Sequence, residues 1–539
     1  MISLFSYFQI GDLTCKNLKS FYNDSKCCNT DTPDAKISTP CDPVRNFGYP
    51  RCYATYMEME NAYQDSTVHA YIPSSSGYAY RPYSWSTPSD CENVPRPLRT
   101  LVAHSSPLGL AVLSAAKDPT MPARFDGQLA ISLTGSWNRA SGTETGYQWD
   151  LAKLKIADGK LATAEGSILL NSPKIEYQDW QGNNAISKKY RPTDIHQAFG
   201  RTFVATKFNS APGTFNGVAQ LDFVAQTEGS PDFKTAAQGA SLSLDCARRL
   251  TSTKEYLYVS VYPYNFCEGR ATWKLGGNFT SSVFAMKKDN LVEHRMVVGG
   301  LHDLDGITVF GDDLYIATSG SSLNRMGNRL LKIANVDAIA ASKFSSLSID
   351  HNTVAGYAGV VTEVVKFDFL QDWHAASALT VTPDGKYVLM SKAAACNVGC
   401  EGVVLAIDLA TKKVYKYASG LRNPAGLHIY DGKLMISDMG SDMGLGTAAE
   451  FEGAFGQEGP NDRVLSMDLY TPTELYSVAC KDDRHGIVAS SKTTCANIIA
   501  EAAGGCDGDW NWPEFAIFGS FADVSIKMNC ELTCGACPA

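Results

Sequence analysis

One local pattern recurs from about residue 97 to residue 470 and constrains the fold more than any other feature. A Gly-Leu or Gly-Ile start is followed by a short apolar run, a tight turn often made by Asp and Gly, and a second apolar or aromatic run. Because Gly and Asp tolerate the positive φ of tight turns, each copy predicts a two-stranded hairpin. Clear copies span residues 306–317, 378–389 and 426–437, and further units start near Leu108, Thr193 and Leu257, the last with weaker turn chemistry.

Repeated hairpins at a spacing of ~45–75 residues are typical of a propeller, in which radial packing leaves only short, protected strand edges. About six units therefore predict an all-β, six-bladed β-propeller over residues 97–472. The alternative is a β-sandwich whose hairpins are alike by accident, and the number of recurrences favours the propeller.

Charge and hydropathy exclude some classes of partner. The chain has 539 residues and a net charge of −9, with an isoelectric point near 5.6. It therefore lacks the basic field that nucleic acids or anionic membranes attract. No apolar stretch reaches the roughly 18–20 residues of a transmembrane helix.

The chain holds 16 cysteines, and most of them lie in two end segments. Such a count indicates disulfides and an extracellular, secreted protein, because cytosolic thiols are kept reduced. A zinc site is the competing interpretation, but only Cys534 and Cys537 have the C-x-x-C spacing. Asn23 and Asn278 lie in glycosylation sequons, which fits secretion.

The cysteines also divide the chain. Residues 1–96 form a cysteine-rich, loop-rich N-terminal segment that we expect to pack on the propeller, with one short helix near residues 16–22. Residues 478–539 form a small disulfide-rich module that could not bury an adequate core alone. Residues 1–10 are apolar but lack the basic start of a signal peptide, so either a targeting segment is missing or the mature chain begins near here.

The C-terminal region resembles the ShK-toxin-like module. The likeness lies in the ten-residue motif Met528-Asn-Cys-Glu-Leu-Thr-Cys-Gly-Ala-Cys537 and in the Gly-Gly-Cys at residues 504–506 that precedes it. The resemblance implies first-to-sixth, second-to-fourth and third-to-fifth pairing. In this sequence those pairs are Cys480–Cys537, Cys495–Cys530 and Cys506–Cys534.

The propeller segments resemble the soluble quinoprotein glucose/sorbosone dehydrogenases. The segments that carry the likeness are Ser105-Ser-Pro-Leu-Gly-Leu110, Gly135-Ser-Trp-Asn-Arg139, Tyr190-Arg-Pro-Thr-Asp-Ile195, Trp373-His374, Cys396-Asn-Val-Gly-Cys400 and Ser419-Gly-Leu-Arg-Asn-Pro-Ala-Gly-Leu427. Their order differs from the family's, since the first two precede the last one here. We interpret this as circular permutation, with domain shuffling or an artefact of sequence assembly as the alternative. Permutation would bring the N-terminal segment close to the strand at residues 464–469.

The resemblance implies a pyrroloquinoline quinone (PQQ) cofactor with Ca²⁺, and it implies roles for particular residues. His374 would be the catalytic base, since a neutral imidazole suits proton abstraction. Arg422 and Asn423 would contact the quinone, and Arg191 and Arg139 are candidates for binding its carboxylates, because the Arg fork matches a carboxylate. The alternatives are a His that hydrogen-bonds a loop and arginines in surface salt bridges.

The resemblance assigns Ca²⁺ to backbone carbonyls of Gly440 and Ser441, oxygen ligands of the kind that a hard cation prefers. Asp438 and Asp442 could help, or could be turn residues, which is the commoner role of Asp in such a loop. Cys396 and Cys400 are expected to form a local disulfide. Cys246 and Cys267, the other two cysteines between the end segments, are also disulfide candidates, and the pairing of the six N-terminal cysteines stays open.

Two departures bear on activity. The family usually has an Arg shortly after the His, where this chain has residues 375–378, Ala-Ala-Ser-Ala; and Thr134 stands where the family commonly has His. Two functions remain. One is a secreted PQQ-dependent oxidoreductase acting on a sugar, polyol or hydrated aldehyde, with an external electron acceptor. The other is a catalytically inactive propeller that binds carbohydrate or belongs to an extracellular assembly.

Overall fold

The structure is a computed structural model of the chain. The residues that it describes are 45–47, 52–54, 68–70, 95, 97–101, 105–135, 148–157, 160–171, 174–178, 184–188, 191–206, 217–222, 232–238, 244, 247–261, 281–301, 304–318, 328–345, 360–367, 378–393, 402–439, 462–472, 509–511 and 523–525. The predictions for the helix near residues 16–22, for Asn23 and Asn278, and for every cysteine assigned to a disulfide concern residues outside these ranges.

Four sheets consist of consecutive antiparallel strands, and each is numbered here from its innermost strand outward. They are β5 (Pro107–Val112), β6 (Gln128–Leu133), β7 (Gln148–Ala157) and β8 (Lys160–Asn171); β11 (Pro192–Ala198), β12 (Arg201–Thr206), β13 (Gly217–Asp222) and β14 (Asp232–Gln238); β15 (Ala247–Ser252), β16 (Tyr256–Val261), β17 (Ser281–Lys287) and β18 (Asn290–Leu301); and β19 (Leu304–Phe310), β20 (Asp313–Thr318), β21 (Asn328–Ile333) and β22 (Thr362–Phe367).

Two further sheets combine strands from distant parts of the sequence. The first has four strands, β27 (Asn423–Tyr430), β28 (Lys433–Met439), β29 (Arg463–Asp468) and β4 (Arg99–Thr100). The second has five strands, β23 (Leu379–Val381), β24 (Tyr387–Lys392), β25 (Gly402–Asp408), β26 (Val414–Leu421) and β1 (Arg45–Asn46), the last of which runs parallel to β26.

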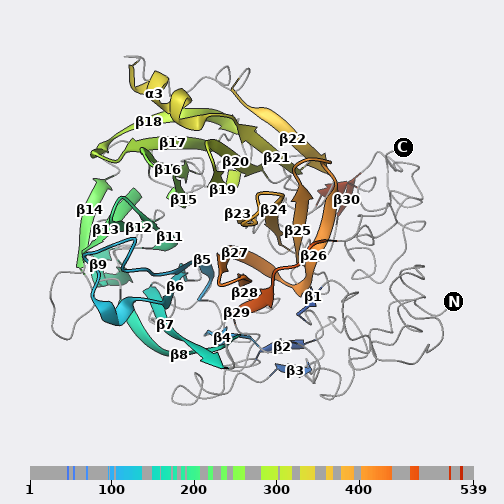
Figure 1. Cartoon of the computed structure of the whole chain (residues 1–539). Coiled ribbons are helices and arrows are strands. Elements are labelled where there is room, and N and C mark those ends of the chain that lie inside the picture. Colours follow the sequence, from blue (N-terminus) through green and yellow to red (C-terminus); the bar gives the residue numbers. More distant parts are fainter. Residues whose placement is uncertain are drawn as a thin grey trace.

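These sheets surround a common axis (Figure 1). Going around it, β5, β11, β15, β19, β23 and β27 each contact the next innermost strand, and β27 contacts β5 again. Apolar side chains fill the spaces between neighbouring sheets, as where Ala111 and Val204 share one buried cluster. The predicted all-β propeller is therefore confirmed, and a β-sandwich does not describe this closed ring.

Three of the predicted hairpins lie where the sequence placed them: β19–β20, β23–β24 and β27–β28. Their turns use the expected chemistry. Asp431 and Gly432 between β27 and β28 have φ of 50° and 72°, and Gly385 between β23 and β24 has φ of 71°. Positive φ at these positions is the conformation that Gly and Asp tolerate best.

The unit predicted to start near Leu257 begins earlier, at Ala247 in β15, and Leu257 lies on its second strand. The turn between the two strands has no Gly. Its geometry is instead stabilised by the Thr253 hydroxyl oxygen, which accepts the N–H groups of Glu255 (3.3 Å) and Tyr256 (3.2 Å). A hydroxyl turn of this kind carries a weaker sequence signal than Asp-Gly.

The helix α3 (Val336–Ser345) was not predicted, and it packs on the outer side of β18 (Figure 1). The side chain of Asp337 accepts the hydroxyls of Thr253 and Tyr258, each at 2.7 Å. At the other end of the helix, Phe344 stacks on Tyr256 with a centroid distance of 5.6 Å. The helix therefore belongs to the outer wall of the neighbouring sheet. Among the described residues, no helix is long and apolar enough to cross a membrane.

Three two-stranded sheets stand apart from the ring sheets: β9 (Lys174–Gln178) with β10 (Asn184–Lys188), β2 (Cys52–Ala54) with β3 (Val68–Ala70), and β30 (Asp509–Asn511) with β31 (Asp523–Ser525). The first of them lies between β8 and β11 in the chain and was not predicted.

The ring closes where strands from its two sequence ends meet, at β4 and β29. Beside this pair, Asp462 Oδ2 accepts hydrogen bonds from Ser105 Oγ at 2.8 Å and from the Ser106 N–H at 2.7 Å. Ser105 and Ser106 lie 357 and 356 positions before Asp462 in the sequence. By pairing with β29, β4 covers a strand edge that would otherwise be exposed.

Residues 45–47 of the N-terminal segment also lie at this closure. Phe47 is fully buried in a cluster that includes Leu421, Leu465 and Met467, and its N–H donates to Ser419 O at 2.9 Å. Proximity of the N-terminal segment to the strand at residues 464–469 was predicted, and it is confirmed for residues 45–47. The circular permutation from which it was inferred stays a prediction.

Candidate functional site

Antiparallel strand order places the start of each innermost strand and the end of each second strand at one face of the ring. We name this the upper face. Arg191 immediately precedes β11, and Arg422 and Asn423 lie at the junction of β26 and β27. His374, Arg139, Gly440 and Ser441 lie outside the described residues. The strands that flank them (β22 and β23, β6 and β7, β28 and β29) have their adjoining ends at the upper face.

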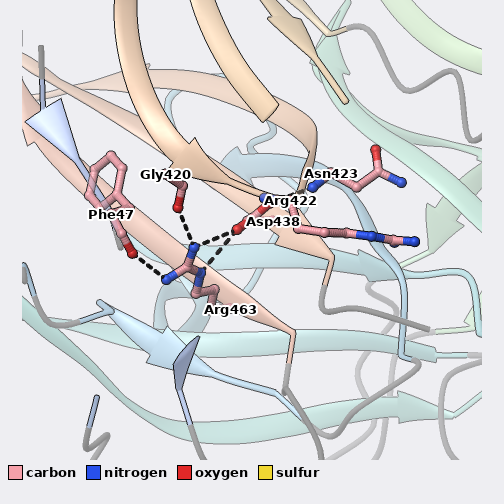
Figure 2. A network of polar contacts seen from close by, with 6 residues as sticks. All are labelled: Phe47, Gly420, Arg422, Asn423, Asp438 and Arg463. Carbon is pink, nitrogen blue, oxygen red and sulfur yellow. Dashed lines mark hydrogen bonds and ion pairs between the residues drawn. The ribbon is translucent and has the colours of Figure 1, made fainter. Parts of the chain in front are cut away.

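At the junction of β26 and β27, a buried carboxylate fixes the backbone (Figure 2). Asp438 Oδ1 accepts the N–H groups of Arg422 (3.0 Å) and Asn423 (2.9 Å). Its Oδ2 accepts Arg463 Nε (3.0 Å) and Nη2 (2.8 Å). Arg463 and Asp438 have exposed fractions of only 3% and 2%. Asp438 is thus fully bonded, and it serves neither as a simple turn residue nor as an available cation ligand.

Arg463 has two further acceptors, both of them backbone carbonyls. Its Nη2 donates to Gly420 O at 2.9 Å and its Nη1 donates to Phe47 O at 2.8 Å. The guanidinium therefore joins β29, the end of β26 and the N-terminal segment around one carboxylate. Four hydrogen bonds from one guanidinium help this ion pair to be buried, because each charge loses its hydration on folding.

The side chains of Arg422 and Asn423 extend away from Arg463, toward the same side (Figure 2). Arg422 has an exposed fraction of 2%, and Asn423 is fully buried. Within the described part of the chain, neither Oδ1 nor Nδ2 of Asn423 has a hydrogen-bond partner. A buried polar group left in this state costs about 1–3 kcal/mol. An amide held here at such a cost is a candidate for binding a polar ligand.

The local sequence explains the tight packing of this junction. The pairing of β27 with β28 shifts register between Pro424 and Gly426, which forms a bulge near the start of the strand. From the adjoining sheet, Gly402 approaches closely: a Cβ there would lie 2.7 Å from Arg422 O and 2.9 Å from Lys392 O. Only Gly fits at residue 402, and the backbone of Arg422 has little freedom to move.

Arg191 makes a different set of contacts from Arg422. Its Nε donates to Thr134 O at 3.1 Å, and its Nη2 donates to Gly135 O at 3.3 Å. The Thr134 hydroxyl donates to Pro192 O. Arg191 and Thr134 thus bridge the end of β6 and the start of β11 at the upper face. β5 lies between β11 and β27 in the ring, so Arg191 and Arg422 flank the same innermost strand.

The axis of the ring contains an arginine that no sequence motif singles out. Arg249, in β15, has an exposed fraction of 7%. Its Nη1 donates to Leu108 O (2.9 Å) and Thr193 O (3.4 Å), and its Nη2 donates to Ala425 O. One guanidinium therefore connects β15 to the innermost strands β5, β11 and β27. In the sequence, Arg249 is recognisable only as the second of two consecutive arginines.

Asp194, in β11, lies next to this arginine. Its Oδ2 accepts the Leu250 N–H at 2.8 Å. Burial raises the pKa of Asp194 to about 6, although the nearby charge of Arg249 opposes the shift. Asp194 therefore titrates in the range just below neutrality, unlike an ordinary Asp.

Two histidines face inter-sheet spaces near the axis. His428 Nε2 accepts the Val112 N–H at 3.2 Å, and His196 Nε2 lies 2.8 Å from Ser252 Oγ. Burial, followed by repulsion from Lys117, lowers the pKa of each to about 4. Both rings are neutral near pH 7 and are engaged in contacts between innermost strands, so they satisfy backbone and hydroxyl groups in the ring.

Within the described residues, no group of three or more His, Cys, Asp or Glu side chains is arranged to hold a metal ion. Carbonyl ligands of the kind predicted at residues 440 and 441 would not register as such a group, and these residues lie outside the described ranges. The described part of the upper face therefore holds the guanidinium groups of Arg191 and Arg422 and the amide of Asn423, and the Asp438 carboxylate nearby is neutralised by Arg463.

The fold and this geometry define a β-propeller with two buried polar residues, Arg422 and Asn423, at its upper face, which we name the polar corner. No family model matches the chain, and no curated protein matches it either. Among solved structures, the chain is similar to a protein described as a 6-phosphogluconolactonase from Bacteroides uniformis, with 13% identity over 59% of this chain and 76% of that one, at a TM-score of 0.29.

Two other similar structures are an α-L-arabinanase from Penicillium chrysogenum in complex with arabinobiose and TolB from Acinetobacter baumannii. The arabinanase has 11% identity over 69% of this chain and 98% of that one, with a TM-score of 0.36. TolB has 11% identity over 53% and 55%, with a TM-score of 0.30. Likeness at this level says nothing of what this chain binds or converts, and the fold assignment rests on the sheets themselves.

Proposed function

We propose that this protein is a PQQ-dependent oxidoreductase that acts on a sugar hydroxyl or a hydrated aldehyde. The observation that carries the proposal is the fully buried Asn423, whose amide has no partner within the described residues, beside the charged Arg422. An amide with two N–H donors and an acceptor oxygen to satisfy, next to a guanidinium, suits a flat ligand that bears carboxylates and carbonyl oxygens.

In this proposal the residues divide the work. Arg422 pairs with a carboxylate of the cofactor through its planar fork, and Asn423 bonds a carbonyl or carboxylate oxygen. His374 takes the proton of the substrate hydroxyl as the carbon gives up a hydride. PQQ, when bound, would supply the two-electron acceptor for that hydride, and an external acceptor would then reoxidise it. Arg139 and Arg191 are further candidates for carboxylate contacts.

The proposed Ca²⁺ is assigned to the carbonyls of Gly440 and Ser441, directly after β28. Asp438 is not proposed as a ligand, since four N–H donors already occupy its two oxygens. Its part is to hold the backbone of Arg422 and Asn423. A charged ligand of the metal would have to come from elsewhere, for example Asp442.

Titration of the purified full-length protein with PQQ and Ca²⁺, followed by absorbance, tests binding. We expect Asn423→Ala to weaken PQQ binding about tenfold, as the loss of one hydrogen bond of about 1.4 kcal/mol would do. Asn290→Ala is the matched control, because Asn290 is exposed at the turn between β17 and β18. Unchanged affinity in Asn423→Ala, or no binding by the wild type, refutes the proposal.

Dye reduction with a panel of sugars then tests the chemistry. His374→Ala should still bind PQQ but reduce dye about 10²–10⁴-fold more slowly, as expected on losing a general base. His294→Ala is the control, since the His294 ring contacts Val292 O on the outer strand β18. Equal activity of His374→Ala and the wild type would remove His374 from the mechanism.

A second candidate function is a propeller that binds carbohydrate or an extracellular partner without catalysis. The specific observation that favours it is the use of Arg191 and Thr134 in bonds to backbone carbonyls between β6 and β11. Sugar binding that needs neither PQQ nor Ca²⁺, together with no dye reduction, would support this candidate over the first.

We also infer that the ring has six blades, with the five-stranded sheet as the sixth. In support, its strand β23 contacts both β19 and β27, as an innermost strand should. Secretion and an ShK-toxin-like C-terminal module remain part of the proposal, and they rest on the 16 cysteines and their spacing. Mass spectrometry of non-reduced peptides tests both, since a Cys480–Cys537 peptide pair is expected and free thiols throughout would contradict it.

A further inference from the structure

Phe47, in the N-terminal segment, is seated beside the polar corner. Its side chain is fully buried in the core cluster that also contains Leu421, Leu465 and Met467. Its N–H donates to Ser419 O (2.9 Å) and its carbonyl accepts Arg463 Nη1 (2.8 Å). β1 immediately before it pairs in parallel with β26, the strand that leads into the corner.

A continuous set of hydrogen bonds links this residue to the candidate ligand site (Figure 2). Phe47 O accepts from Arg463, Arg463 donates to Asp438 Oδ2, and Asp438 Oδ1 accepts the N–H groups of Arg422 and Asn423. Each link is 2.8 to 3.0 Å long. Arg463, Asp438 and both residues of the corner are buried.

A buried ion pair adds little net stability over apolar side chains of the same size, because both charges lose hydration. Its geometric effect is larger. The Arg463 fork fixes the carboxylate plane of Asp438, and that plane fixes where the Arg422 and Asn423 backbone can lie. If the Phe47 carbonyl withdrew, one buried guanidinium N–H would lose its acceptor, and Arg463 would have to shift or admit water to satisfy it.

We infer that Arg463 and Phe47 are positioning residues for the ligand site, so that docking of residues 45–47 and ligand binding at Arg422 and Asn423 favour one another. The ligand part of this inference rests on the proposed function. Residues 45–47 then belong to the site through the positions that they give to Arg463 and Asp438. Coupling of this kind typically changes affinity by about 5- to 150-fold.

The test compares Phe47→Ala with Phe203→Ala in the full-length protein. Phe203 is also fully buried, in the cluster between β12 and β15, so both variants lose the same side chain from a core. Two quantities are measured for each: the Kd for PQQ with Ca²⁺, and hydrogen exchange of the Arg422 and Asn423 amides. Phe47→Leu serves if Phe47→Ala does not fold, and Arg463→Lys tests the fork while retaining the charge.

We expect Phe47→Ala and Arg463→Lys to raise the Kd by at least about fivefold and to speed exchange at Arg422 and Asn423 by about tenfold or more. Phe203→Ala should lose comparable thermal stability with neither effect. Equal effects in Phe47→Ala and Phe203→Ala, or no change in exchange at the corner, would overturn the inference. If the wild type binds no PQQ but exchange changes only in Phe47→Ala and Arg463→Lys, the proposed cofactor fails while the positioning role stands.

Discussion

Replacing Arg249 by Met would remove the guanidinium that connects four innermost strands at the axis. Methionine retains most of the side-chain volume, so the change mainly deletes donors. The carbonyls of Leu108, Thr193 and Ala425 lose a charged donor. Each buried acceptor left unsatisfied costs about 1–3 kcal/mol. The bond to Thr193 is long, at 3.4 Å, and Leu108 O also accepts Ser437 Oγ. We therefore expect a loss of about 4 kcal/mol in the free energy of unfolding.

The same substitution has a pH dependence whose sign follows from Asp194. In the folded protein the pKa of Asp194 is raised to about 6 from 3.8, so the folded state binds its proton more tightly than the unfolded chain. Stability therefore falls as pH rises between these values. Because Arg249 holds this pKa down, its removal raises the pKa further and extends the fall to higher pH. The deficit of Arg249→Met should be larger at pH 8 than at pH 5.

Urea unfolding followed by tryptophan fluorescence at pH 5, 7 and 8 measures both effects, with midpoints and slopes compared. Arg201→Met is the matched control, because Arg201 is exposed at the turn between β11 and β12 and should change stability by less than about 0.5 kcal/mol. A deficit below about 1 kcal/mol for Arg249→Met at pH 7, with an unchanged slope, would show that the axial bonds do not hold the strands together.

Three other predictions concern single positions. Asp194→Asn should abolish most of a wild-type stability loss of about 2 kcal/mol between pH 4 and pH 6, the larger part of the about 3 kcal/mol that a shift of the pKa from 3.8 to about 6 corresponds to over the whole pH range; parallel pH profiles of the two proteins would contradict this. Gly402→Ala should lower stability by about 1–3 kcal/mol in thermal unfolding, because its Cβ would meet backbone oxygens at 2.7 and 2.9 Å, and an unchanged midpoint would show that the backbone yields easily. Tyr417→Phe retains the stacked ring on Tyr470 but loses the hydroxyl bonds to Tyr470 O (3.1 Å) and N–H (2.8 Å), so exchange of the Tyr470 amide should rise about tenfold. Equal exchange in the two proteins would count against that hydroxyl as the anchor.

The propeller could be predicted because its signal is local and repeated. The Asp431-Gly432 turn and its counterparts specify hairpins within a dozen residues, and recurrence of such units specifies the ring. Where the turn used another device, as at Thr253, the start of the unit was placed too late. The helix α3 was not predicted, because a search for period-two strand patterns does not reveal a short helix. Its anchor, Asp337, bonds to side chains of another sheet, which the local sequence does not indicate.

The site was predicted only in part, for a reason of geometry. Arg422 and Asn423 stand out in the sequence because they belong to a compact motif. Arg463 and Arg249 do not, since their roles depend on which carbonyls the closed ring brings to them. Asp438 was noticed, but its function could not be decided before its four donors were known. The roles of His374, Arg139, Gly440 and Ser441 remain predictions.

Closure of the ring also has a consequence for how the chain acquires its structure during synthesis. A ribosome delivers Phe47 long before Arg463, which lies 416 positions later in the sequence. β4 must therefore wait for its partner β29, and the Phe47 carbonyl must wait for Arg463. Bringing such distant segments together is entropically slow. A nascent chain that ends before Arg463 already contains Arg422, Asn423 and Asp438, but it lacks the cation that orients them. The corner is consequently assembled late, once β29 is in place, and the Phe47 carbonyl that completes its hydrogen bonds comes from outside the sheet that holds Asn423, Asp438 and Arg463.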